Sequence, residues 1–135
     1  GLMSSRQMVF SSFPRSGPPP RFRDYADYAE VVGQLERTGC IADYTHIWWD
    51  IRPHPRLGTL EIRICDAQPD LAESQSLAAL CVSLAARIAR ALDEGEPIAE
   101  QPHRLIEENM WRAIRYGLSG DLIDLEQREV QGRGS

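Results

Sequence analysis

Two runs of alternating apolar and charged residues, joined by a segment rich in turn formers, constrain the fold of this chain more than any other feature. The stretch reads "WWDIRPHPRLGTLEIRICD", Trp48 to Asp66. Because side chains alternate between the two faces of a strand, the pattern predicts one strand from Thr45 to Arg52 and another from Thr59 to Asp66. The link "PHPRLG" favours a turn, so we expect an antiparallel hairpin.

The alternation gives this hairpin one apolar and one charged face. The apolar face, which is expected to pack on helices, carries Ile47, Trp49, Ile51, Leu60, Ile62 and Ile64. The other face carries Asp50, Arg52, Glu61 and Arg63. Two interpretations of the charge are equally good. It is a solvated face with cross-strand ion pairs, or it is a site for anions and metal, because guanidinium groups suit phosphate oxygens and carboxylates suit Mg²⁺.

The rest of the chain predicts helices around the hairpin. Apolar residues at three- and four-residue steps indicate helices over 24–38, 69–94 and 102–116, with capping residues at their ends. The segment 121–130 suits a short strand or a helix. The order predicts an α+β fold, an antiparallel sheet backed by helices. Two strands alone are marginally stable in water, so further strands are expected elsewhere.

The N-terminal residues 1–21 are predicted to be irregular. The stretch "SSFPRSGPPPRF" holds four of the nine prolines, and consecutive prolines exclude a helix or a central strand. Such a segment is a surface linker, a ligand for SH3-type domains, or an ordered loop that crosses a site. Composition alone slightly favours the linker or SH3-ligand interpretation over the ordered loop.

Composition narrows the classes of partner. The chain of 135 residues has a net charge of −5, so the basic surface typical of nucleic-acid binding is not expected. No apolar run of membrane-spanning length and no signal-peptide core are apparent, so no membrane partner is expected. Three cysteines without a CxxC pair suggest reduced, buried thiols. These features lead us to expect a cytoplasmic protein.

Three motifs in order resemble one known family. They are the hairpin stretch, "SSRQMVFSSFPRSGPPPRF" before it and "EENMWRAIRYGLSGDLID" after it, and together they extend over nearly all of residues 3–126. The chain resembles the type 2 glutamate–cysteine ligases, or carboxylate–amine ligases, of the glutamine synthetase superfamily. The resemblance implies a fragment of a glutamine synthetase-like catalytic domain, whose antiparallel sheet curves around the active site. It also implies that ATP phosphorylates the γ-carboxylate of glutamate and that an amine such as cysteine displaces phosphate.

The resemblance also implies roles for individual residues. Glu61 matches the metal-binding glutamate, here a ligand of Mg²⁺, and Arg63 matches the arginine that meets the γ-phosphate of ATP. Arg56 and Arg63 are the expected catalytic groups, and Arg52 and Arg56 match basic residues that neutralise phosphate or substrate. The other expected substrate or nucleotide ligands are His54, Arg15, Asn109 and Arg112. A turn histidine is more often simply exposed, and an ion pair with Glu108 explains Arg112 equally well.

The family differs from this chain in length. Its members are several hundred residues long, and nothing in this chain resembles their N-terminal portion with its metal-binding carboxylates. We therefore expect one unit of a larger ligase domain, with a proline-rich loop at 1–21, helices and hairpin at 22–126 and a tail at 127–135. The isolated chain is expected to be inactive and to self-associate as a homo-oligomer. The alternatives are a non-catalytic binding module, or a superfamily enzyme with another amine acceptor or a guanidino acceptor.

Overall fold

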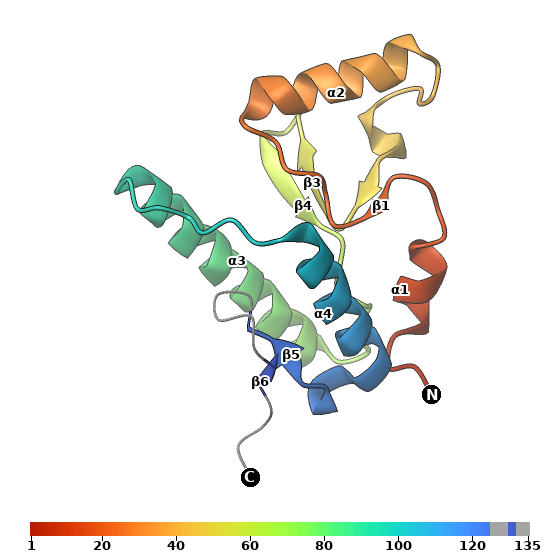
Figure 1. The fold of residues 1–135 in the computed structure, drawn as a ribbon, viewed down its shortest axis with the longest axis vertical. Coiled ribbons are helices and arrows are strands. Elements are labelled where there is room, and N and C mark those ends of the chain that lie inside the picture. The colour runs from red at the N-terminus through yellow and green to blue at the C-terminus, as the bar shows by residue number, and fades with distance from the viewer. Residues whose placement is uncertain (125–129, 132–135) are drawn as a thin grey trace. The chain divides into compact units, whose positions relative to one another are not determined.

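The computed structural model describes residues 1–124 and 130–131. The chain forms two compact units, residues 5–64 and residues 1–4 with 65 onward, and each is described by itself. The helices are α1 (Ser5–Phe10), α2 (Tyr25–Arg37), α3 (Leu71–Asp93) and α4 (His103–Tyr116), with 3₁₀ turns η1 (Tyr44–His46) and η2 (Gly117–Ser119) (Figure 1). The strands pair two by two: β1 (Ser16–Gly17) with β2 (Trp48–Trp49), β3 (Ile51–His54) with β4 (Thr59–Ile62), and β5 (Leu122–Ile123) with β6 (Val130–Gln131).

The three long helices confirm the sequence predictions nearly to the residue. Asp24 caps α2 and Asp70 caps α3, each by accepting a hydrogen bond from a main-chain N–H of the first turn. Each helix is followed by a glycine with positive φ, a conformation that costs glycine little: Gly39, Gly95 and Gly117. The mixture of helices with small, mainly antiparallel strand pairs agrees with the α+β class.

The prediction that residues 1–21 are irregular is wrong. The short helix α1 forms before the first proline, and β1 pairs in parallel with β2. The main-chain N–H of Trp48 donates to the carbonyl of Arg15 at 2.8 Å, and that of Asp50 donates to Gly17 at 2.8 Å. These hydrogen bonds fix the start of the proline-rich segment, so it is an ordered loop rather than a linker.

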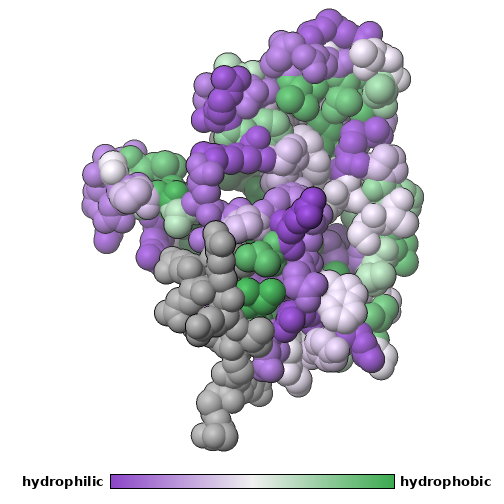
Figure 2. All heavy atoms as spheres, viewed as in Figure 1, coloured by the Kyte–Doolittle hydropathy of each residue, from purple (hydrophilic) through white to green (hydrophobic). Residues whose placement is uncertain are grey.

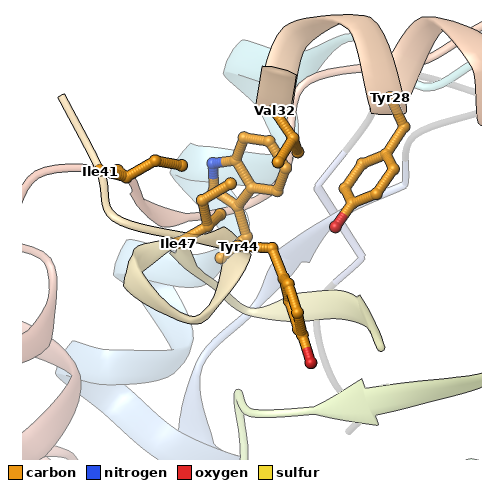
Figure 3. Close-up of a cluster of buried hydrophobic side chains, with 6 residues drawn as sticks. Tyr28, Val32, Ile41, Tyr44 and Ile47 are labelled. Carbon is orange, nitrogen blue, oxygen red and sulfur yellow. The ribbon is translucent and has the colours of Figure 1, made fainter. Parts of the chain in front are cut away.

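The core of the unit 5–64 joins α2 to the segment before the hairpin. Tyr28 and Val32 project from α2 onto Ile41, Tyr44 and Ile47, as Figure 3 shows. Trp49 completes the cluster. Ile47 has no exposed surface, so it anchors this core. In Figure 1, α2 lies beside the turn end of the β3–β4 hairpin.

The predicted first strand is divided at Asp50. Thr45 lies in η1, β2 pairs with β1, and β3 pairs with β4. Because β2 and β3 have different partners, the chain bends at Asp50 and the alternation of faces does not continue through it. Trp49 is therefore buried, whereas Ile51, predicted to share its face, is 40% exposed.

The hairpin itself pairs as predicted, but its faces are buried in the opposite sense. β3 and β4 are antiparallel with Arg52 directly opposite Glu61, which confirms the expected register. The prediction that the apolar face packs on helices holds for Ile47 and Trp49, which cluster with α2, and is wrong for Leu60 and Ile62, which are 61% and 38% exposed. Arg52, on the charged face, is only 7% exposed. The interactions that make this possible are described below.

The apolar stripe of α3 is not part of a core in this chain. None of the residues of α3 is buried, and Leu80, Leu84 and Ile88 are each about half exposed. Hydrophobic residues are open to the surface at the end of α3 on the left of Figure 2. By length and composition alone α3 could cross a membrane, since 18 consecutive residues of it have a mean hydropathy of 1.3. The expectation that no apolar segment reaches the length of a membrane span is therefore wrong. Helices that pack inside soluble proteins have the same composition.

The C-terminal segment contains a short strand pair. Within 121–130, Leu122–Ile123 pairs antiparallel with Val130–Gln131, which favours the strand interpretation for these residues. The predicted tail, apart from residues 130–131, lies outside the described residues.

None of the three cysteines forms a disulfide, as expected, but Cys40 is exposed rather than buried.

Candidate functional site

The candidate site is built around the cross-strand pair Arg52 and Glu61. Arg52 donates from Nε to Oε2 of Glu61 at 3.0 Å and from Nη2 to the same oxygen at 2.5 Å. The two residues occupy directly opposed positions of β3 and β4, where side chains on one face lie closest. The hairpin register thus sets this ion pair.

Arg52 is also bound to the main chain below it. Its Nη1 donates to the carbonyl oxygens of Thr45 at 2.8 Å and Ile47 at 2.9 Å. Its guanidinium carbon lies 6.0 Å from the centre of the Tyr44 ring. A buried charge is stable only when it is paired and hydrogen-bonded, and Arg52 meets both conditions. This explains why the charged face, and not the apolar face, is the buried side of β3. Arg52 holds Glu61 in place and has few donors left for a substrate.

Arg63 binds the other oxygen of Glu61. Its Nη1 donates to Oε1 at 2.5 Å, so Glu61 lies between two guanidinium groups. Burial acts to raise the pKa of Glu61, but the hydrogen bonds and positive charges of Arg52 and Arg63 outweigh it and lower the pKa. Glu61 is therefore ionised at neutral pH. Nε of Arg63 is buried and has no hydrogen-bond partner among the described residues, so Arg63 retains a donor that Arg52 lacks.

Helix α1 brings a second arginine to Arg63. Arg6 donates from Nη2 to the carbonyl oxygen of Arg63 at 3.0 Å. The guanidinium carbons of Arg6 and Arg63 lie 4.6 Å and 5.9 Å from the centre of the Phe10 ring. The sequence drew attention to Arg6 only through its motif. Its place beside Arg63 depends on α1, which the proline-rich composition concealed.

Asp50 is a buried carboxylate at the bend between β2 and β3. It accepts a hydrogen bond from Nε2 of Gln7 at 3.2 Å on one oxygen, and its other oxygen has no hydrogen-bond partner among the described residues. Burial raises the pKa of Asp50, and the Gln7 hydrogen bond and the Arg6 charge offset this only in part. The hydrogen-bond donor to Asp50 is thus Gln7, and Arg6 acts on it through its charge.

Asp50→Asn is expected to be at least as stable as the native chain at pH 7, because ionised Asp50 is disfavoured by burial. The folded chain binds the Asp50 proton more tightly than the unfolded chain, whose carboxyl has a pKa near 3.8. Native stability therefore falls as the pH rises from that value through the raised pKa. The advantage of the variant should be absent below about pH 3.8 and should grow through that window, measured as the free energy of unfolding in urea.

The exposed Asp93→Asn at the end of α3 is the control for the loss of a surface carboxylate and should leave the free energy of unfolding at pH 7 nearly unchanged. A less stable Asp50→Asn at pH 7 would contradict the expected cost of the ionised carboxylate.

The remaining predicted residues of this unit lie around the hairpin turn. The ring of His54 meets Tyr44, whose hydroxyl lies 3.2 Å from Nε2 of the imidazole. Arg56 is exposed in the turn, beyond the last strand pair, and lines a groove beside α2. Arg15 adopts a positive φ of 59° and donates from Nε to the carbonyl oxygen of His46 at 3.3 Å. No described contact joins these three residues to Glu61.

With this geometry in view, comparison with known proteins identifies the family. Residues 1–134 match the family described as glutamate-cysteine ligase family 2. The chain belongs to glutamate–cysteine ligase family 2. It is 50% identical over 133 residues to a protein of Rubrobacter xylanophilus provisionally named glutamate–cysteine ligase 2-3, a match that covers 98% of this chain and 35% of that protein.

Two further relatives extend this comparison. Provisionally named glutamate–cysteine ligase 2 proteins from Sorangium cellulosum and Roseiflexus sp. are 42% and 43% identical, over 96% and 98% of the chain. The matches cover 34% and 35% of those relatives. The chain thus spans about a third of the length of the curated ligase-family proteins that it matches. The motif resemblance to the family is confirmed.

The third family motif lies in the other unit of the chain, on α4. The side-chain amide of Asn109 donates to the carbonyl of Ile123 at 2.8 Å and accepts from its N–H at 2.7 Å, so it holds β5 to α4. Arg112 donates to Glu108 at 2.9 Å, which confirms the ion pair. Both side chains therefore have structural partners within their own unit, and their substrate contacts stay predictions.

Within the part of this glutamate–cysteine ligase family chain that the structure describes, no cluster of metal ligands is present. Among residues 1–124 and 130–131, no group of three or more His, Cys, Asp or Glu side chains is placed to hold a metal. Both oxygens of Glu61 already accept hydrogen bonds from arginines. Magnesium prefers several oxygen ligands in octahedral geometry, and Glu61 contributes a single carboxylate.

Proposed function

We propose that the protein to which this chain belongs is an ATP- and Mg²⁺-dependent ligase. It activates the γ-carboxylate of glutamate, or a similar carboxylate, as an acyl phosphate and couples it to an amine such as cysteine. Family membership and the names of the relatives support a ligase of the glutamate–cysteine type. One observation in the structure supports this chemistry at the hairpin: an ionised Glu61 lies between two arginines, and one of these keeps a free donor.

In this proposal the two arginines have different tasks. Arg52 is a positioning residue, because its donors already bind Glu61 and two carbonyl groups. Arg63 contacts the γ-phosphate of ATP through its uncommitted donor, with Arg6 adding positive charge beside it. Phosphoryl transfer depends on positioning and charge neutralisation more than on covalent help from the protein. A preorganised guanidinium next to a fixed carboxylate supplies both.

The proposal assigns the remaining parts of the site to the rest of the protein. The carboxylates that complete a Mg²⁺ site, and further strands of a glutamine synthetase-like sheet, come from the two thirds of the family length that this chain does not span. The exposed hydrophobic residues of the hairpin and α3 are consistent with such a covering part. The 135-residue chain alone should therefore not catalyse the reaction.

The isolated chain is also expected to self-associate. The exposed apolar side chains of α3 and the open edges of two-stranded pairs favour contact between copies. Light scattering at micromolar concentration should give a mass of at least two chains. Leu84→Glu, which places a charge on the exposed stripe, should shift the mass toward that of one chain, whereas Glu94→Gln at the exposed end of α3 should not. A monomeric native chain would contradict the expectation.

A phosphate-release assay tests the proposed function. The whole protein is given ATP, Mg²⁺ and glutamate together with a panel of amines, and cysteine is compared with other primary amines and with guanidino compounds. We expect release that requires both glutamate and an amine, and that stops when EDTA removes the metal. Mass spectrometry should identify a γ-glutamyl amide. Release without amide formation, or no release with any acceptor, would refute the proposal.

A further inference from the structure

A groove separate from the Arg52–Glu61 pair opens between α2, η1 and the β3–β4 turn. It measures about 330 Å³ and is open on one side. The residues that give it its chemistry are Tyr25, Tyr28, Tyr44, Glu36, Asp43 and Arg56. All of them lie in the unit 5–64, and the hydrophobic cluster that contains Tyr28 and Tyr44 fixes the floor. Figure 3 shows these two rings projecting from α2 and η1.

Tyr25 presents an exposed aromatic face to the groove, and Tyr28 contributes one uncommitted hydroxyl. The rings of Tyr25 and Tyr28 lie 5.6 Å apart between centres and are tilted by 37°. Tyr28 is 3% exposed, and its buried hydroxyl has no hydrogen-bond partner among the described residues. Buried polar groups are nearly always satisfied, so an unsatisfied hydroxyl in a groove wall indicates a missing ligand or water. Burial raises the pKa of Tyr28, which keeps the hydroxyl protonated.

The groove also has an excess of negative charge. Asp43 accepts hydrogen bonds from the N–H of Thr45 at 2.8 Å and from its hydroxyl, and these hydrogen bonds lower the pKa of Asp43, so the carboxylate is ionised. Glu36 adds a second carboxylate on the exposed side of α2. Against these two charges stands the guanidinium of Arg56 at the turn. Aromatic rings flanked by carboxylates are the arrangement that recognises organic ammonium groups.

We propose that this groove binds the ammonium group of a small primary amine, with Arg56 placed to meet a carboxylate when the amine is an amino acid. The ammonium lies over the exposed ring of Tyr25, because Tyr28 is buried and Arg52 already lies against the ring of Tyr44. The hydroxyl of Tyr28 accepts one of its hydrogen bonds, and Glu36 and Asp43 balance its charge. The inference rests on the proposed function in one respect: it makes this groove the docking site of the amine acceptor.

Direct binding to the whole protein, without ATP, tests the inference. Ethylammonium, L-cysteine and propionate are titrated separately and followed by saturation-transfer NMR of the ligand. Ethylammonium and L-cysteine should bind saturably, and propionate, which lacks the ammonium, should not. Glu36→Gln and Tyr25→Leu should each weaken ethylammonium binding about fivefold, as the loss of one charge or one aromatic face implies. Both positions are exposed, so the variants should fold.

Glu30→Gln is the matched control, because it removes the same charge from α2 outside the groove. It should change binding less than twofold, by the same arithmetic. Absence of saturable ethylammonium binding, or unchanged affinity in both groove variants, would overturn the inference. Ammonium binding without any ligase turnover would leave the inference standing and remove the proposed function. Ligase turnover with unchanged ammonium binding in both groove variants would support the proposed function and overturn the inference about the groove.

Discussion

Replacement of Arg52 by alanine should lower the free energy of unfolding by about 3 kcal/mol. Arg52 is 7% exposed and donates to Glu61, Thr45 and Ile47. Its removal leaves the buried carbonyl oxygen of Ile47 and the partly buried carbonyl oxygen of Thr45 without this donor, and an unsatisfied buried group costs roughly 1–3 kcal/mol. Glu61 is partly exposed, so water can replace some of its lost pairing. The carbonyl groups therefore account for most of the loss.

Arg52→Lys should recover only part of this stability. An ammonium group cannot reach a carboxylate and two carbonyls at once in the fork geometry of a guanidinium. Arg37→Ala is the control, because the side chain of Arg37 is 63% exposed and its pair with Glu30 lies on the surface, where such pairs contribute at most about 1 kcal/mol. Urea unfolding, followed by tryptophan fluorescence, gives the free energies. Equal losses for Arg52→Ala and Arg37→Ala would show that Arg52 is not an anchor of the fold.

The prediction for Arg52 also explains where sequence patterns succeed and fail. Helix boundaries follow from local chemistry: Asp24 caps the start of α2, and glycines with positive φ follow the three long helices. The hairpin register also follows, since the turn and the alternation are both local. Alternation does not say which face is buried. The usual rule places apolar residues inside, but a guanidinium with four hydrogen bonds lies inside while Leu60 stays exposed.

Contacts between distant segments could not be predicted from pattern. Gln7 reaches Asp50 across 43 positions of sequence, and Arg6 reaches Arg63 across 57. Neither pairing leaves a periodic signal, and prolines after Phe10 suggested an irregular start. The candidate residues of the hairpin could be named from the sequence, because the family motif and the alternation of strand faces point to the same side chains. The groove beside α2 was missed, because the spacing of Tyr25 and Tyr28 fits the apolar side of a helix equally well.

Removal of the Arg63 side chain should have the largest effect on activity. If the whole protein is the proposed ligase, Arg63→Ala should lower kcat by about 10²–10³, the range seen when one preorganised donor to a developing anion is lost. KM for ATP should change less, because other groups bind the rest of the nucleotide. Glu61 keeps its partner Arg52 in this variant, so the hairpin should stay folded. Phosphate release under saturating glutamate and amine is the measurement.

Comparison of variants separates a direct role of Arg63 from a structural one. Arg63→Lys keeps the charge but loses the fork of donors, so its kcat should lie between those of Arg63→Ala and the native protein. Arg90→Ala, a side chain 80% exposed on α3, should leave kcat unchanged. The urea midpoint of Arg63→Ala should remain close to the native value, whereas that of Arg52→Ala should fall. If Arg63→Ala retained more than about a third of native kcat, charge at this position would contribute under 1 kcal/mol to the transition state, and the γ-phosphate assignment would be wrong.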